Sequence, residues 1–234
     1  MYYREKQKFC QVTKSYRAGI EMTKLIIVRH GQSEGNLLHR FAGQTDVPLT
    51  DLGRRQAAAV TEYLKNETID AVYSSDLSRA YNTVRGSAEI RGLEVIPDKN
   101  LREINVGDWE FKFYDEIDAN YHKQWELWRN DMSKCEPENG ESVKALADRI
   151  VREIREIALK NDGKTVLIGT HATPIRVMET VWRGLPFEAI KDLEWVKNAS
   201  VTRVDYFPDG SFELKAFNVY DFQGDMATGF PKTV

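Results

Sequence analysis

One short stretch of the chain carries residues that are suited to phosphoryl transfer. Residues 25–36 read LIIVRHGQSEGN, so that Arg29 and His30 directly follow a run of apolar residues. Neutral imidazole exists in quantity near pH 7, and a neighbouring guanidinium disfavours a second positive charge on it. The guanidinium also presents a planar fork of donors that matches phosphate oxygens. The pair predicts a nucleophile at His30, although a turn-capping histidine explains an isolated Arg-His-Gly equally well.

Two later residues also follow predicted strands. Arg79 comes after the predicted strand 70–74 and falls in the first turn of a predicted helix, where backbone amides and the helix dipole favour an anion. His171 directly follows the predicted central strand 164–170, KTVLIGT. Ligands of open α/β sheets collect at the carboxyl ends of strands, which is where His30 is expected to lie.

A third segment supplies the acid that phosphoryl transfer from an ester requires. Residues 101–110, LREINVGDWE, contain Glu103, Asp108 and Glu110. One carboxyl group can protonate the departing oxygen and later take a proton from water. The residues alone leave the choice among the three open, because a glutamate among charged neighbours is usually solvated.

These segments together resemble the histidine phosphatase superfamily, which contains the cofactor-dependent phosphoglycerate mutases and many small-molecule phosphatases. RHGQSEGN resembles the family's signature, and GQTDVPLTDLG, SSDLSRAYNT, LREINVGDWE and GTHATPIR are similar to its later segments. The segments occur in the family's order between Lys24 and Phe217. The shared order of these segments makes coincidence a poor explanation.

The resemblance implies a role for each candidate residue. His30 attacks phosphorus and forms a phosphohistidine, while Glu103, as the glutamate of Arg-Glu, protonates the leaving alcohol. No metal or other cofactor is implied. The remaining site residues are expected to bind the phosphoryl oxygens: Arg29, Asn36, Arg79 and His171.

Three positions depart from the family's common pattern. Ala42 stands where a polar residue often donates to the phosphoryl group, so this loop is expected to make fewer phosphate contacts. Phe111 stands where glycine is common, which is expected to change the path of the loop. Ala172 replaces a glycine after His171 but still provides a backbone amide.

The resemblance favours a phosphatase over two alternatives. Family mutases usually carry, after the acid motif, an insertion with an Arg-His-Tyr run that closes over the substrate. The segment YDEIDANYHKQWELW, between Glu103 and His171, contains nothing similar. We therefore expect a metal-independent phosphatase for small phosphomonoesters. The alternatives are a phosphoglycerate mutase and a phosphate-binding module without catalysis.

The elements around these residues predict an α/β fold. Periodicity and capping residues predict helices over 51–65, 75–83 and 142–161, strands over 25–28, 70–74, 94–97 and 164–170, and a hairpin of 200–207 with 212–219. The alternation agrees with the fold that the resemblance implies, a three-layer α/β/α sandwich with a mainly parallel sheet and an antiparallel edge.

Two of the predicted helical regions carry many charged or aromatic residues. Residues 114–132 are expected to form two short helices that cap the site, with Tyr121, Trp125 and Trp128 used for packing. The charged face of helix 142–161, including Arg149 and Glu153, is interpreted as solvated surface.

Composition limits the classes of function. The net charge of −3 gives no electrostatic support for nucleic-acid binding by the whole domain. No apolar run is long enough to cross a bilayer. Cys10 and Cys135 have neither metal-ligand nor redox spacing, which favours a reducing cytoplasm. The expected partner is a small phosphorylated metabolite, and the oligomeric state, including a homodimer, is left open.

The chain length is sufficient for one α/β domain. We expect an N-terminal extension over 1–21, which lacks the hydrophobic core of a secretory signal. A histidine phosphatase-like domain is expected over 22–221, with its helical cap around 112–140. Residues 222–234 are interpreted as a C-terminal tail.

Overall fold

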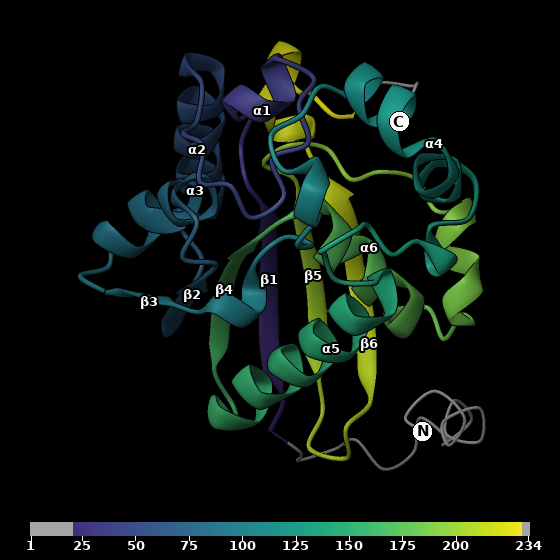
Figure 1. Cartoon of the computed structure of the whole chain (residues 1–234). Coiled ribbons are helices and arrows are strands. Elements are labelled where there is room, and N and C mark those ends of the chain that lie inside the picture. Colours follow the sequence, from purple (N-terminus) through teal and green to yellow (C-terminus); the bar gives the residue numbers. More distant parts are fainter. Residues whose placement is uncertain (1–20, 231–234) are drawn as a thin grey trace.

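A six-stranded mixed sheet forms the centre of the computed structural model, which describes residues 21–230 (Figure 1). The strands lie in the order β3 (Val95–Pro97), β2 (Ala71–Ser74), β4 (Thr165–Thr170), β1 (Thr23–Arg29), β5 (Val201–Tyr206) and β6 (Phe212–Val219). The first four are parallel, whereas β5 and β6 pair antiparallel. The predicted parallel sheet with an antiparallel edge is confirmed.

Helices cover both faces of this sheet, and the sequence of β1 suits burial on both faces. Successive strand residues point to opposite faces. Leu25 and Ile27 pack in one hydrophobic core, whereas Ile26 and Val28 pack in the other. The unbroken apolar run is therefore explained by burial on both sides, and the three-layer sandwich is confirmed.

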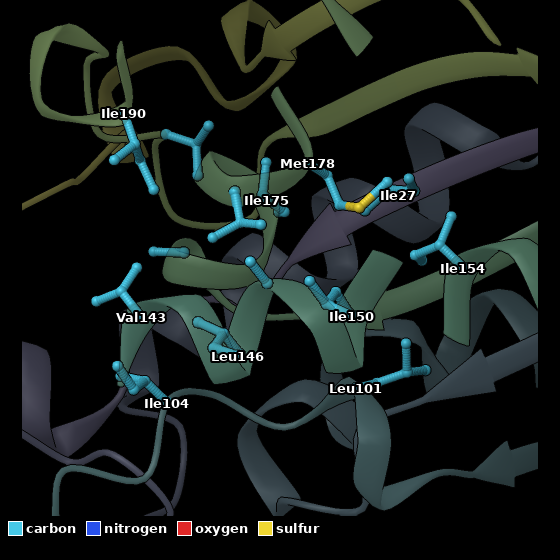
Figure 2. Close-up of a cluster of buried hydrophobic side chains, with 14 of the residues drawn as sticks. Ile27, Leu101, Ile104, Val143, Leu146, Ile150, Ile154, Ile175, Met178 and Ile190 are labelled. Carbon is cyan, nitrogen blue, oxygen red and sulfur yellow. The ribbon is translucent and has the colours of Figure 1, made fainter. Parts of the chain in front are cut away.

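The two cores differ in the helices that supply them. Side chains of α5 (Val143–Lys160) and α6 (Ala172–Trp182) form the first with β1, and Figure 2 shows Ile27 of β1 with side chains of these two helices. Side chains of α2 (Asp51–Leu64) and α3 (Ser78–Glu89) form the second. The hydroxyls of Thr50 and Ser142 cap α2 and α5 by accepting backbone N–H bonds, as their sequences predict.

The helix predicted over 75–83 begins and ends later than expected, because α3 starts at Ser78 and ends at Glu89. Gly86 does not stop it. A Cβ at Gly86 would lie 2.7 Å from the hydroxyl oxygen of Thr61 on α2. The glycine therefore allows α2 and α3 to approach closely, and its entropic cost in the helix is offset by packing.

The aromatic region forms α4 (Tyr114–Asp131), in which Tyr121 has non-helical dihedral angles (φ −131°, ψ 31°). Two helical segments therefore meet at Tyr121 with no loop between them. Trp125 and Trp128 are each only 2% exposed, and both rings contact Trp109. The predicted packing role of these tryptophans is confirmed.

The charged face of α5 corrects one interpretation. Arg149 is half-buried, pairs with Glu141 and donates to the backbone carbonyls of Arg102 and Glu103. Glu153 is only 7% exposed and accepts from the side chain of Asn100. This face is not simply solvated, because the segment that leads to Glu103 packs across it.

Short helical turns complete the described chain. They are α1 (Glu34–Leu37), η2 (Lys99–Leu101), η3 (Gly107–Trp109), η4 (Met132–Lys134), η5 (Phe187–Asp192) and η6 (Asp221–Met226). The region interpreted as a tail thus contains η6. The predictions for 1–20 and 231–234, including Cys10, lie outside the described residues. Of the helices within 21–230, none has the length and apolarity to span a bilayer.

Candidate active site

The carboxyl ends of β1 and β4 bring two histidines together. Arg29 pairs with Thr170 in the parallel register, so His30 and His171 follow at adjacent strand ends. The backbone N–H of His30 donates to the carbonyl of Thr170 at 3.0 Å. The two imidazole centroids lie 5.1 Å apart, edge to face. This sheet edge is where open α/β sheets bind ligands.

A backbone hydrogen bond fixes the tautomer of His30. Its Nδ1 lies 2.7 Å from the carbonyl oxygen of Gly31, and a carbonyl only accepts, so Nδ1 carries the hydrogen. Burial, and then the charges of Arg79 and Arg29, hold the pKa of His30 well below 6.5. The imidazole is therefore neutral at pH 7 with its lone pair on Nε2.

His171 is neutral for the same reasons and is positioned by a hydroxyl. Its Nε2 lies 2.8 Å from Oγ of Ser75, and its Nδ1 is buried with no hydrogen-bond partner among the described residues. Burial, and then the charge of Arg79, hold the pKa of His171 well below 6.5. His171 contacts His30 but does not itself line the adjacent cavity.

Arg29 and Arg79 are cations that backbone carbonyls hold in place, and each is only 1% exposed. Arg29 donates to the carbonyl of Val196, and Arg79 donates to those of Gly43 and Thr45. Burial lowers the pKa of each guanidinium to about 10, and the charge of Glu103 opposes this shift. Both arginines therefore stay charged at pH 7. Within the described chain, the Nε of each is buried without a partner.

Glu103 is the buried carboxyl group beside these cations. Its two oxygens accept from the backbone N–H groups of Ile104 at 2.8 Å and Thr173 at 3.3 Å. Burial raises its pKa above 4.5, although these hydrogen bonds oppose the shift. This environment favours a protonated carboxyl more than water does, which suits a general acid.

The other two acidic residues of this segment form hydrogen bonds outside the cavity. Glu110 accepts from the backbone N–H groups of Gln44 and Thr45 and from the hydroxyl of Thr45. It thereby braces the loop whose carbonyls hold Arg79. Asp108 accepts from the side chain of Asn139 at 3.1 Å. Neither acid lines the cavity.

Five of the six predicted site residues line one small cavity: Arg29, His30, Asn36, Arg79 and Glu103. The Oδ1 of Asn36 accepts from the backbone and hydroxyl of Ser33 and from Asn198, which leaves the amide nitrogen of Asn36 for a ligand. The cavity is also lined by Ser33, Arg40, Phe41, Ala42, Gly43, Tyr114 and Phe230.

The three departures have identifiable consequences. Ala42 lines the cavity without a side-chain donor. Phe111 adopts a left-handed backbone (φ 58°), the conformation that glycine adopts without strain, so the replacement does not remove this turn. Ala172 begins α6, and the next amide, of Thr173, donates to Glu103.

Sequence reasoning missed the residues that hold segment 221–230 against the signature loop. The side chain of Asn198 donates to the carbonyl of His30 at 3.2 Å. Gln56 accepts from the backbone N–H of Gln32 at 2.7 Å and donates to the carbonyl of Met226 at 2.6 Å. Segment 221–230 then brings the Phe230 ring within 4.8 Å of the Arg29 guanidinium. No periodic pattern marks this segment.

The comparisons with known proteins identify the family and agree with this fold. The profile of the histidine phosphatase superfamily (branch 1) matches residues 25–219. The chain therefore belongs to this superfamily and is one of its enzymes.

Named relatives include phosphatases and a mutase. Phosphoserine phosphatase 1 of Hydrogenobacter thermophilus is 34% identical over 67% of this chain and 74% of its own length. A probable phosphoglycerate mutase of Serratia proteamaculans is 33% identical over 79% of this chain and 86% of its own. The structure of a mycobacterial glucosyl-3-phosphoglycerate phosphatase with VO3 has a TM-score of 0.77 at 31% identity, covering 84% of this chain and 99% of that one. The activity thus lies within the phosphatase or mutase chemistry of the superfamily.

Proposed function

We propose that the protein is a phosphatase that hydrolyses small phosphomonoesters through a phosphohistidine on His30, without a metal ion. The fixed tautomer of His30 carries this proposal, because it leaves a lone pair on Nε2 beside two buried cations. The relatives named as phosphatases support it. Cytoplasmic localisation is part of the same proposal.

In the first step, Nε2 of His30 attacks phosphorus in line with the leaving alcohol. A P–N bond forms while the P–O ester bond breaks, and the departing oxygen takes a proton from Glu103. The raised pKa of Glu103 supports this role, because the acid must hold its proton before the step. The first step leaves a phosphohistidine, a carboxylate and a free alcohol.

In the second step, water attacks the phosphohistidine and gives a proton to the Glu103 carboxylate. The P–N bond breaks, inorganic phosphate leaves, and His30 returns to its neutral state. The same carboxyl group therefore serves as acid and then as base.

Charge balance around the cavity supports a phosphomonoester as the ligand. Arg29 and Arg79 are charged at pH 7 while both histidines are neutral. Burial raises the pKa of Glu103, which reduces the share of its charged form at a given pH. The two guanidinium charges match the two negative charges of a phosphoryl dianion, and the unpartnered Nε atoms of Arg29 and Arg79 are available as donors.

Phosphate release by wild type and His30→Ala tests the proposal, with His122→Ala as a control because His122 lies exposed on α4. We expect release in EDTA, an acid-labile phosphoenzyme, a loss of several orders of magnitude in His30→Ala and none in His122→Ala. Near-normal activity of His30→Ala would overturn the assignment. Isomerisation of 3-phosphoglycerate that requires 2,3-bisphosphoglycerate, with little release, would instead identify a mutase.

A further inference from the structure

We infer that Arg40 forms a second anion-binding subsite in the cavity, which accepts a carboxylate on the alcohol portion of the substrate. The inference rests on the proposed phosphomonoesterase, because the phosphoryl group must occupy the part of the cavity beside His30. Arg40 lines the same cavity as Arg29 and Arg79 but belongs to the turn after α1.

Two aromatic rings and a carbonyl hold the Arg40 guanidinium. Its Cζ lies 3.8 Å from the ring centroid of Phe113 and 4.7 Å from that of Phe111. Its Nη1 donates to the carbonyl of Phe111 at 2.8 Å, and the backbones of Arg40 and Phe113 form an antiparallel bridge. The fork is thus oriented before any ligand binds, which reduces the entropy lost on binding.

The backbone of Phe111 is strained in a way that favours this arrangement. A bulky residue at φ 58° is uncommon, and such strain concentrates at functional sites. Here the strained residue supplies both a ring face and a carbonyl to Arg40. Glycine would adopt the same backbone freely but would lack the ring.

Arg40 also lacks an internal counter-ion. Within residues 21–230, no aspartate or glutamate forms an ion pair with it, and its Nε is buried without a partner. A phosphoryl dianion matches the charges of Arg29 and Arg79, so the charge of Arg40 remains available for a third negative charge. The guanidinium fork fits a carboxylate in two parallel hydrogen bonds.

The cavity is small, which favours a small ligand. A carboxylate is planar and smaller than a second phosphoryl group, so we assign the subsite to a carboxylate. The substrate class is then a short phosphorylated hydroxy or amino acid.

Matched pairs of ligands test the subsite. 3-Phosphoglycerate and glycerol 3-phosphate differ only in a carboxylate against a hydroxymethyl group, and O-phosphoserine differs from phosphoethanolamine only in its carboxylate. We expect wild type to prefer the carboxylate member about 10- to 100-fold in kcat/KM, the range of a hydrogen bond to a charged group. Calorimetry is expected to show that the carboxylate member of each pair also binds more tightly.

Arg40→Gln is expected to reduce this preference to within about threefold, whereas Arg55→Gln on the exposed surface of α2 retains it. Phe111→Gly relieves the backbone and is expected to lower the preference to an intermediate value. It provides the test if Arg40→Gln does not fold.

Equal kcat/KM of wild type for both members of each pair would overturn the inference. A preference for the carboxylate member that survives in Arg40→Gln would also overturn it. Tighter binding of glycerol 1,3-bisphosphate than of 3-phosphoglycerate, if lost in Arg40→Gln, would overturn the carboxylate assignment in favour of phosphate. A binding preference that depends on Arg40 without phosphate release would support the subsite and overturn the proposed hydrolysis.

Discussion

Replacing Gln56 by alanine should weaken the fold and the active site together. This side chain lies on α2 with none of its surface exposed. Its oxygen accepts from the backbone N–H of Gln32 in the signature loop, and its nitrogen donates to the carbonyl of Met226 and the hydroxyl of Thr228. One amide thus joins the signature loop to segment 221–230.

The magnitude follows from the groups that the substitution leaves without partners. The N–H of Gln32 loses its side-chain acceptor and the carbonyl of Met226 loses its side-chain donor, while the hydroxyl of Thr228 keeps a hydrogen bond with Asn198. A buried unsatisfied group costs about 1–3 kcal/mol, and because Gln32 and Met226 are half-buried, each of these two groups falls in the lower part of that range. With the removed packing, we expect a loss of about 2–5 kcal/mol in the free energy of unfolding.

Urea unfolding of wild type and Gln56→Ala measures this loss, and Glu62→Ala on the exposed face of α2 is the control, expected within about 0.5 kcal/mol of wild type. Phosphate release by the folded variant should also fall, because the signature loop and segment 221–230 both contribute to the cavity and lose the side chain that joins them. A loss below about 1 kcal/mol with unchanged kcat/KM would refute this reasoning, because the groups that bond to Gln56 would then have found other hydrogen-bond partners.

Three further predictions concern α2, the proposed acid and the charged face of α5. Helix propensity alone predicts that Gly53→Ala stabilises by about 1 kcal/mol, but the new Cβ would lie 2.0 Å from the carbonyl oxygen of Gln32. We therefore expect a loss of more than about 2 kcal/mol, and a raised Tm would contradict this. Glu103→Gln should lower kcat about 10²- to 10⁴-fold on glycerol 3-phosphate and much less on p-nitrophenyl phosphate, whose leaving group needs no proton; equal losses would argue against the acid role. Burial, and then the neighbouring Asp98, raise the pKa of Glu153 from 4.5 to about 7, so ionisation of this carboxyl destabilises the fold as pH rises through that interval. Glu153→Gln should be more stable than wild type above pH 7, with the difference shrinking toward pH 4.5 in urea titrations, and a difference independent of pH would refute the linkage.

The parts of the site that sequence predicts are those with a local signal. His30 follows LIIVR and His171 follows VLIGT, and mainly apolar runs of this kind identify strands buried on both faces. Arg79 lies in the first turn of the helix that follows a strand, and the resemblance of SSDLSRAYNT to the family singles it out. These cues involve neighbours in sequence, so one sequence suffices to read them.

The parts that sequence does not predict depend on contacts between distant segments. Helical periodicity locates the buried stripe of α5. It does not indicate that the segment leading to Glu103 crosses the charged face of this helix, where its carbonyls accept hydrogen bonds from Arg149. Asn198 and Phe230 reach the site from segments without any periodic pattern. The left-handed backbone of Phe111 is likewise a tertiary effect, because local preference favours glycine there.

The position of β1 in the sheet has a consequence for synthesis of the chain on the ribosome. β1 is the first described strand to emerge, yet its two neighbours are β4 and β5, which lie far downstream. The local pair β2 and β3 can form early, whereas the LIIV segment waits with both hydrogen-bonding edges and both apolar faces uncovered. Exposed segments of this kind bind chaperones and aggregate. Among the described strands, the one that precedes the proposed nucleophile is thus made before either of its neighbours, and it must stay unaggregated until β4 and β5 are made.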